Sequence, residues 1–431
     1  MTAAALTLPQ PRGACPGLSA PMATGDGLLV RLQPIGTIAL DGFAALCAAA
    51  RQHGNGIIEV TSRGSIQIRG LSAASAPRFA AAVATLGIAA GDGIPVLINP
   101  LAGLDAEDII DAGALAADLR LALAQNSLTQ RLSAKVSVAI DGGGALNVDR
   151  VAADVRLRAE VLQNGIVVRI GVGGDHGTAS DLGAVSPNDG IAAVTHLLEV
   201  LAQRGRGARA RDVLAAEGIA VFRSAVADLL VVSAPPRLRR NERQEPIGLH
   251  RLRDGTFAYG IGLAFGHADT TALQRLTDAA KAAGARGMRA APGRALMIVG
   301  LTRQTADSFA AAAEALGFIV HADDPRRHVV ACAGAPICAS ADIAARALAP
   351  QIAAAAAPHL DGSFKIHISG CAKGCAHPAP ATLTVVGTPA GCALISNGST
   401  RDAPFKIVAT IELPDAIASI ARDLKQKGGH V

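Results

Sequence analysis

Residues 26–71 begin DGLLVRLQPIG and end RGSIQIRGL, and residues 254–301 begin DGTFAYGIGLAFG and end GRALMIVGL. The two stretches differ in length by two residues, and each predicts a strand, a helix, a strand, a turn and a strand. In the first stretch, Ile66 and Ile68 alternate with polar residues, which predicts a half-buried strand. The chain therefore contains one structural unit twice.

The two copies also predict matching helices. The first helix is expected from about Asp41 to His53, with Gly54 after it, and the second from about Thr270 to Ala283, with Gly284 after it. A glycine at this place is the residue expected for a left-handed helix end.

A second repeated block follows each copy. Ala102-Gly103 precedes an alanine-rich helix and the strand KVSVAIDGG, which starts at Lys135. Ala333-Gly334 precedes an alanine-rich helix, expected to break at Pro350, and the strand KIHISGC, which starts at Lys365. Two α/β modules, each present twice, thus fill nearly the whole chain. Residues 233–246, rich in proline and charge, are predicted to link the halves.

Composition narrows the possible functions. The 431 residues suggest two to four domains, and the 50% hydrophobic content supplies real cores. Nine Phe, one Tyr and no Trp argue against stacking on nucleic acid, so no nucleic-acid partner is expected. The net charge is +5, and arginines cluster at residues 204–211 and 237–243. These clusters are either solvated surface charge or an anion-facing patch.

The sequence predicts a cytoplasmic protein without a membrane partner. No apolar run reaches the ~18 residues that span a bilayer, and the N-terminus lacks the basic and apolar regions of a secretory signal. Seven cysteines, an odd number, argue against a disulfide framework.

Four cysteines lie close together near the C-terminus. Cys332 and Cys338 occur in CAGAPIC, and Cys371 and Cys375 occur in CAKGC. Four thiolates from two neighbouring glycine-containing loops can hold a 4Fe–4S cluster. Structural zinc, which usually uses CxxC spacing, and unrelated buried cysteines are the alternatives.

The other cysteines are not expected to bind metal. Cys47 and Cys392 are predicted to be structural, and no role is assigned to Cys15. In the first repeat, Asp141-Gly142-Gly143-Gly144 stands where SGCAKGC stands later, so only one copy is expected to carry the chemistry.

CxxxxxC followed by SGCxxxC on a twice-repeated plan resembles the sulfite and nitrite reductase family. The resemblance implies an α+β fold with pseudo-twofold duplication, in which two ferredoxin-like half-domains pair and two reductase-like α/β domains flank them. The implied boundaries are 20–95 and 247–325 for the half-domains, 96–232 and 326–431 for the α/β domains, and 233–246 for the linker.

RGACPGLSAPMATGDGLLVRL, NPLAGLDAEDIID and HISGCAKGCAHP most resemble the branch of this family that acts on a precorrin in aerobic cobalamin biosynthesis. That resemblance implies an oxygen-dependent monooxygenase, which hydroxylates precorrin-3A at C20 and closes a γ-lactone to give precorrin-3B. It also implies a 4Fe–4S cluster on the four cysteines and an additional non-haem iron. His367 and His377 flank the cluster loop, but no iron ligand is assigned.

Electrons are expected from a separate donor fed by reduced nicotinamide. GIGLAFG (260–266) and GVGGDHG (171–177) lack the glycine spacing of a dinucleotide-binding turn. One alternative function is a siroheme-dependent sulfite or nitrite reductase, in which siroheme would be the second cofactor. The other is a non-enzymatic, cluster-bearing tetrapyrrole carrier or sensor.

The resemblance also implies a tetrapyrrole-binding set. Its members are Arg31, Arg63, Gln67, Arg69 and Lys135. Gly64 and Ser137 replace a glutamine and a second lysine of the reductases, so part of their small-anion site is missing. Guanidinium groups spread around a cleft suit the many carboxylates on the rim of a precorrin. The alternative is that these residues are plain surface charges.

Overall fold

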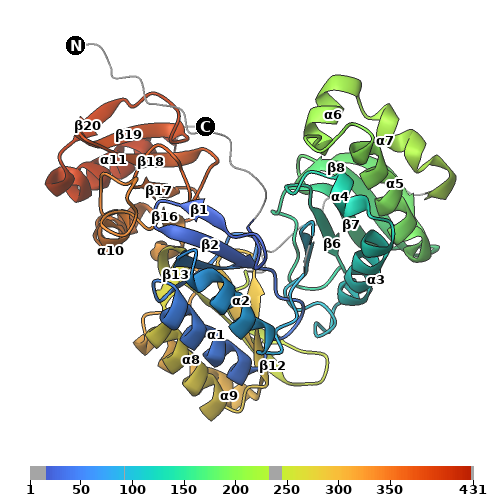
Figure 1. Cartoon of the computed structure of the whole chain (residues 1–431), viewed down its shortest axis with the longest axis horizontal. Coiled ribbons are helices and arrows are strands. Elements are labelled where there is room, and N and C mark those ends of the chain that lie inside the picture. The colour runs from blue at the N-terminus through green and yellow to red at the C-terminus, as the bar shows by residue number, and fades with distance from the viewer. Residues whose placement is uncertain (1–15, 92, 233–244, 429–431) are drawn as a thin grey trace.

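The computed structural model describes residues 16–91, 93–232 and 245–428. Figure 1 shows three lobes. The paired lobe (residues 22–91 and 245–324) lies at the bottom, the first α/β lobe (93–232) at the right and the second α/β lobe (325–428) at the left. Cys15, most of the predicted linker and the arginine cluster at 237–243 fall outside the described residues.

The paired lobe contains two antiparallel sheets. The first has the order β1 (Met22–Thr24), β2 (Gly27–Leu32), β4 (Ile66–Leu71), β3 (Ile57–Val60) and β13 (His267–Asp269). The second has the order β11 (Gly248–Arg251), β12 (Phe257–Gly262), β15 (Ala295–Leu301) and β14 (Gly287–Ala291). The helices are α1 (Leu40–His53), α2 (Ser75–Ala84), α8 (Thr270–Ala282) and α9 (Arg303–Ala315).

The two halves exchange backbone at their sheet edges. Strand β13, which belongs to the second half, pairs with β3 of the first. In the reciprocal position, Ile38 and Met288 of β14 exchange two N–H···O bonds of 2.8 and 2.9 Å. One hydrophobic core holds side chains from both halves, including Phe43, Phe79 and Phe309. The two repeated units therefore share one core and are related to each other by a pseudo-twofold axis.

The two α/β lobes share one strand order. In the first lobe, β5 (Val96–Ile98), β6 (Val138–Asp141) and the start of β7 (Ala153–Leu162) run parallel, and β8 (Gly165–Gly174), β9 (Ser180–Val185) and β10 (Leu230–Val231) continue antiparallel. In the second lobe, β16 (Val329–Ala331), β17 (Ile366–Ser369) and β18 (Ala381–Thr388) run parallel, and β19 (Gly391–Gly398) and β20 (Lys406–Val408) continue antiparallel.

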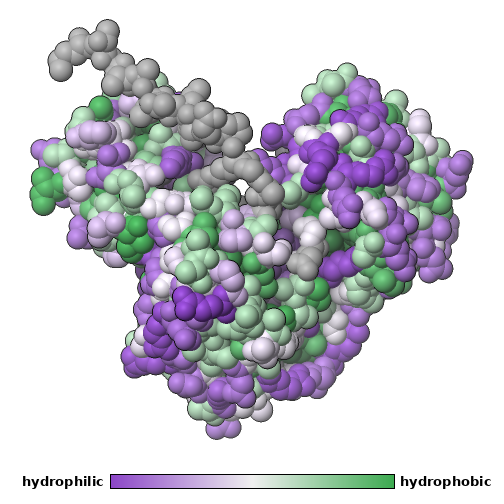
Figure 2. All heavy atoms as spheres, in the orientation of Figure 1, coloured by the Kyte–Doolittle hydropathy of each residue, from purple (hydrophilic) through white to green (hydrophobic). Residues whose placement is uncertain are grey.

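Helices cover one face of each of these sheets. The first lobe has α3 (Ala112–Gln125), α4 (Leu128–Arg131), α5 (Gly190–Ala202), α6 (Ala210–Glu217) and α7 (Ala220–Ala225). The second has α10 (Ala345–Ala356) and α11 (Leu413–Gly428). Figure 2 shows the molecular surface hollowed between the two α/β lobes. No helix in the described part of the chain is long and apolar enough to cross a membrane.

The duplicated architecture and the two matched helices of the paired lobe confirm the sequence prediction, but three local expectations were wrong. Gly284 is left-handed (φ 74°), whereas Gly54 is extended (φ −114°). A Cβ atom on Gly54 would lie 2.5 Å from the carbonyl oxygen of Arg69, so close backbone approach requires this glycine.

The second wrong expectation concerns α10, which continues through Pro350 instead of breaking there. An internal proline costs about 3 kcal/mol. Burial of Leu348, Ala349, Ile352 and Ala353 against the sheet offsets that cost. The third concerns β4, whose polar residues are buried as well as its apolar ones, because the second α/β lobe covers the polar face near the cysteine loops.

Candidate functional site

The four predicted cysteine ligands come to one edge of the second α/β lobe. Cys332 directly follows β16, and Cys371 follows β17 after Gly370. The two strands are parallel neighbours, so their carboxyl ends meet at the same edge. The backbone N–H of Cys332 donates to the Ile368 carbonyl at 3.1 Å, and that of Gly370 donates to the Cys332 sulfur at 3.1 Å.

Glycines allow the two cysteine loops to approach each other. A Cβ on Gly370 would lie 2.6 Å from the Cβ of Ala341 and 3.2 Å from the Cα of Gly334. Gly334 is left-handed (φ 69°), and its Cβ would lie 2.4 Å from the backbone nitrogen of Ala345. Any larger residue at either place would push the loops apart.

The thiols influence one another electrostatically. Burial raises the pKa of Cys332 to about 11, and the thiols of Cys375 and Cys371 act in the same direction. Burial also raises the pKa of Cys371, again with Cys375 and Cys338 adding to the rise. Bound iron would offset the cost of ionising these neighbouring thiols, because metal ions bind thiolates and favour their deprotonation.

All four thiols lie near one another, because Cys375 and Cys371 influence the pKa of Cys332, and Cys375 and Cys338 influence that of Cys371. Across the described ranges, no three His, Cys, Asp or Glu side chains gather closely enough to hold one metal ion. A cube of iron and sulfide spreads its four thiolate ligands over a wider volume than a single zinc ion does. Four thiols on two adjoining loops have the ligand chemistry of a 4Fe–4S cluster.

The first half of the chain closes over these loops. Gly25, in the β1–β2 turn, lies against Cys338, since a Cβ there would be 2.3 Å from the sulfur. The N–H of Ala339 donates to the Gly25 carbonyl at 2.7 Å. Next to this turn, Arg69 donates to Asp26 at 2.9 Å and to Glu59 at 3.0 Å.

Three predicted tetrapyrrole-binding residues belong to this single network. Gln67 faces Arg31 across β4 and β2. With its amide oxygen towards Arg31, Gln67 accepts two N–H groups at 2.9 and 3.1 Å and donates to Glu59 at 3.2 Å. Arg69, which also pairs with Glu59, belongs to the same network and is only 7% exposed. The structure thus places Arg31, Gln67 and Arg69 on the sheet of the paired lobe that meets the second α/β lobe.

Arg63 lies where the paired lobe contacts the first α/β lobe, and Lys135 belongs to the first α/β lobe. Arg63 donates to the Ala152 carbonyl at 2.6 Å and to the Ser137 hydroxyl at 3.3 Å. Lys135 is exposed, two residues before Ser137. Arg63 also lines a pocket between the paired lobe and the first α/β lobe, together with Asn99 and Arg289. Of these, Arg289 was not among the residues that the sequence pointed to.

Comparison with known proteins identifies the family. The nitrite/sulfite reductase ferredoxin-like half domain matches residues 20–86, and the nitrite and sulphite reductase 4Fe-4S domain matches residues 92–232. The precorrin-3B synthase of Sinorhizobium sp is 38% identical over 96% of this chain and 89% of its own length. The chain belongs to the precorrin-3B synthase family.

More distant relatives of this precorrin-3B synthase family member are reductases. The ferredoxin–nitrite reductase of Synechococcus elongatus is 24% identical over 84% of the chain and 77% of the relative. The structure of Mycobacterium tuberculosis NirA protein superposes with a TM-score of 0.72 at 20% identity, covering 92% of this chain and 80% of that one. This structural likeness shows the shared fold.

The matched 4Fe-4S domain segment, residues 92–232, has no cysteine in this member of the precorrin-3B synthase family. Its loop at Asp141–Gly144 is filled by hydrogen bonds. Asn99 accepts the N–H of Gly142 at 2.7 Å and donates to Asp141 at 3.0 Å. Asp105 accepts the N–H of Ala145 at 2.7 Å. The first α/β lobe therefore keeps the fold without the thiols.

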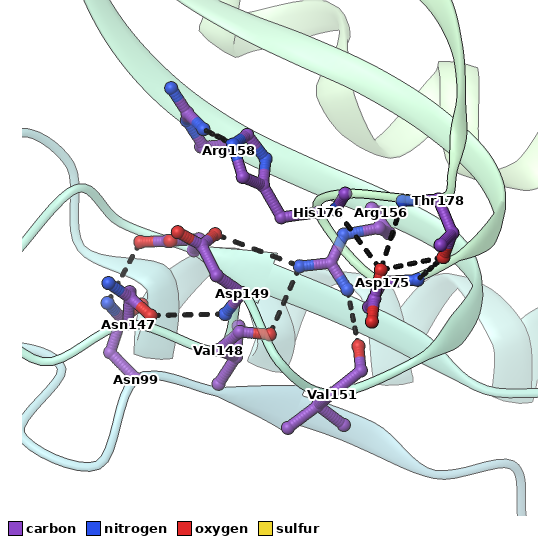
Figure 3. Close-up of polar contacts among 12 residues, drawn as sticks. Asn99, Asn147, Val148, Asp149, Val151, Arg156, Arg158, Asp175, His176 and Thr178 are labelled. Carbon is purple, nitrogen blue, oxygen red and sulfur yellow. Dashed lines mark hydrogen bonds and ion pairs between the residues drawn. The ribbon is translucent and has the colours of Figure 1, made fainter. Parts of the chain in front are cut away.

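Hydrogen bonds and an ion pair connect Arg156 and Arg158 to neighbouring residues of the same lobe (Figure 3). Arg156 donates to the carbonyls of Val151 and Val148, and its guanidinium lies 3.9 Å from the carboxylate of Asp149. Arg158 contacts the ring of His176 at 3.0 Å. Burial lowers the pKa of Arg156, which three nearby aspartates counteract.

His367 and His377 flank the cysteine loops as expected. Their ring centroids are 5.7 Å apart. Neither ring nitrogen of His367 has a hydrogen-bond partner among the described residues, and burial lowers its pKa to about 3. Within the described chain, no third His, Cys, Asp or Glu side chain gathers with them closely enough to hold one metal ion.

Sequence reasoning missed Glu59 and Arg346, which join the network beside the cysteines at 3.3 Å. Arg346 is the only charged residue between Ile343 and Ala357. A lone charge in an alanine-rich helix was the signal that could have revealed it.

Proposed function

We propose that this chain is an oxygen-dependent monooxygenase that converts precorrin-3A to precorrin-3B, by hydroxylation at C20 and formation of a γ-lactone. The observation that carries the proposal is the 38% identity with a precorrin-3B synthase over almost the whole of both chains. The four thiols at one edge of the second α/β lobe supply the expected redox centre. The domain boundaries 20–95, 96–232, 247–325 and 326–431 form part of the proposal.

Cys332, Cys338, Cys371 and Cys375 would hold a 4Fe–4S cluster, which supplies single electrons when bound. The precorrin is proposed to lie between the lobes, with Arg31, Arg63 and Lys135 binding its rim carboxylates. Gln67 would hold Arg31 in place through the contacts described above. Arg69 is already paired with two carboxylates, so in this proposal it orients the network next to the substrate.

The proposal includes two further partners, molecular oxygen and a separate protein that delivers electrons from reduced nicotinamide. The absence of a dinucleotide-binding glycine pattern in the sequence supports a separate donor. A cytoplasmic location is proposed because it keeps cluster thiols reduced. A non-haem iron also forms part of the proposal, with no ligand and no step assigned to it.

The test uses anaerobically purified full-length protein with iron and sulfide counted. Incubation with precorrin-3A, a reductant and ¹⁸O₂ should place one labelled oxygen atom in the product. The absorption spectrum should show a broad iron–sulfur band and no intense Soret band.

The second candidate function is a siroheme-dependent sulfite or nitrite reductase, favoured by the similarity to the Synechococcus enzyme. A stoichiometric Soret-absorbing haem with sulfite or nitrite turnover would establish that function and overturn the first. Precorrin binding without turnover would instead indicate a carrier or sensor.

A further inference from the structure

Arg346, the second residue of α10, has unused hydrogen-bond donors in a buried place. Its Nη2 lies 3.3 Å from Oε1 of Glu59, and its side chain is 16% exposed. Its Nε and Nη1 atoms are buried and have no hydrogen-bond partner among the described residues. Leaving buried donors unpaired costs roughly 1–3 kcal/mol, and more for a charged group. A ligand that accepts these hydrogens would remove that cost.

The surroundings of Arg346 point to the cysteine loops. The helix start that carries it touches the loop between Cys332 and Cys338, because a Cβ on Gly334 would lie 2.4 Å from the backbone nitrogen of Ala345. Burial lowers the pKa of Arg346, while Glu59, Asp26 and the Cys332 thiol act to raise it.

The ion pairs around Glu59 fix the position of the Arg346 side chain. Glu59 accepts from Arg69 at 3.0 Å, and Arg69 also pairs with Asp26 at 2.9 Å. Two guanidinium groups thus face two carboxylates. Removing Arg346 would leave one net negative charge beside the thiols.

We propose that Arg346 is a positioning residue for the iron–sulfur cluster, anchored by Glu59, with Nε–H and Nη1–H donating to cluster or thiolate sulfur. This inference rests on the proposed cluster. A reduced cluster carries one more negative charge than an oxidised one, so a fixed cation with two N–H donors favours reduction and raises the potential. Arg346 thereby makes the cluster easier to reduce by the electron donor.

The experiment is a redox titration of the full-length holoprotein, monitored by absorbance and electron paramagnetic resonance. Arg346→Gln should keep four iron and four sulfide. Its equilibrium constant for one-electron reduction should fall at least tenfold, a shift of about 59 mV to lower potential. Arg346→Lys, which keeps the charge but not the fork of donors, should lie between the wild type and Arg346→Gln.

Arg303→Gln is the matched control, because Arg303 is 67% exposed on α9 and pairs only weakly with Asp307 at 3.9 Å. Its potential should equal that of the wild type. An intact cluster with unchanged potential in Arg346→Gln would overturn the inference.

Cluster loss in Arg346→Gln that Arg346→Lys restores supports the inference, whereas equal loss in both variants overturns it in favour of a purely structural role. The proposed function fails separately, if the wild-type protein itself takes up no cluster.

Discussion

The two α/β lobes arrange their strands in the same way, and they differ in what occupies the loops at the carboxyl ends of their first two parallel strands. In the second lobe, those loops carry Cys332 and Cys371 and approach each other through glycines. In the first lobe, Asn99 and Asp141 fill the equivalent place with hydrogen bonds. One fold thus supports two loop chemistries, because the sheet positions the loops whatever side chains they contain.

The largest effect is expected when the thiols that distinguish the second α/β lobe from the first are removed. Serine at Cys332, Cys338, Cys371 or Cys375 should abolish the visible absorption of the cluster and most activity, because a serine hydroxyl is a poor substitute for a thiolate ligand. Iron and sulfide analysis with absorption spectra provides the measurement.

Cys47 and Cys392 are the controls, because both are completely buried in hydrophobic cores. Alanine at either should retain the cluster. Full iron and sulfide content in two of the four serine variants would show that the ligand assignment is wrong.

An intermediate effect is expected where the paired lobe meets the first α/β lobe. Arg63→Ala and Lys135→Ala should each weaken precorrin binding by about 1.5–3 kcal/mol, the usual worth of a charged hydrogen bond. Titration calorimetry or fluorescence with precorrin-3A gives the affinity, and the cluster absorption should be unchanged.

Arg63 also contacts Ser137, so Ser137→Ala serves as its control. That variant disturbs the protein contact and keeps the charge, and it should bind substrate nearly normally. Wild-type affinity in both the Arg63 and Lys135 variants would remove these residues from the substrate site.

The smallest effect concerns the acidic loop of the first lobe. Burial raises the pKa of Asp108 to about 6, and the nearby Asp105 adds to the rise while the N–H of Gly103 opposes it. The stability from this shift is present below the unfolded pKa of about 4 and is lost as the pH rises through 6. Asp108→Asn should therefore raise the melting temperature by about 2–4 °C at pH 8, or about 1 kcal/mol after solvent screening, and by about half as much at pH 5.

Asp254 supplies a control of opposite sign. Hydrogen bonds from Thr256 and Arg286 lower its pKa to about 2. Asp254→Asn should lower the melting temperature at pH 8. Thermal unfolding of both variants at pH 5 and pH 8 tests the pair, and equal gains for Asp108→Asn at the two pH values would contradict the proposed ionisation.

The duplication and the position of the chemistry could be predicted from the sequence. Repeated strand and helix patterns are local, and the cysteine spacing is visible in the chain without any knowledge of packing. The paired helices α1 and α8 and the loops around Cys332 and Cys371 follow from these patterns.

Only the tertiary structure decided how the copies differ. Asp26 and Asp254 occupy the same place in the repeat, yet Asp26 is buried against Arg69 and Asp254 is exposed beside Arg286. Arg346 meets Glu59 although 286 residues lie between them in the chain. Sequence periodicity reports which face of an element is apolar, whereas the partner that covers a polar face depends on how separate lobes pack. That packing buries the charged network beside the cysteines.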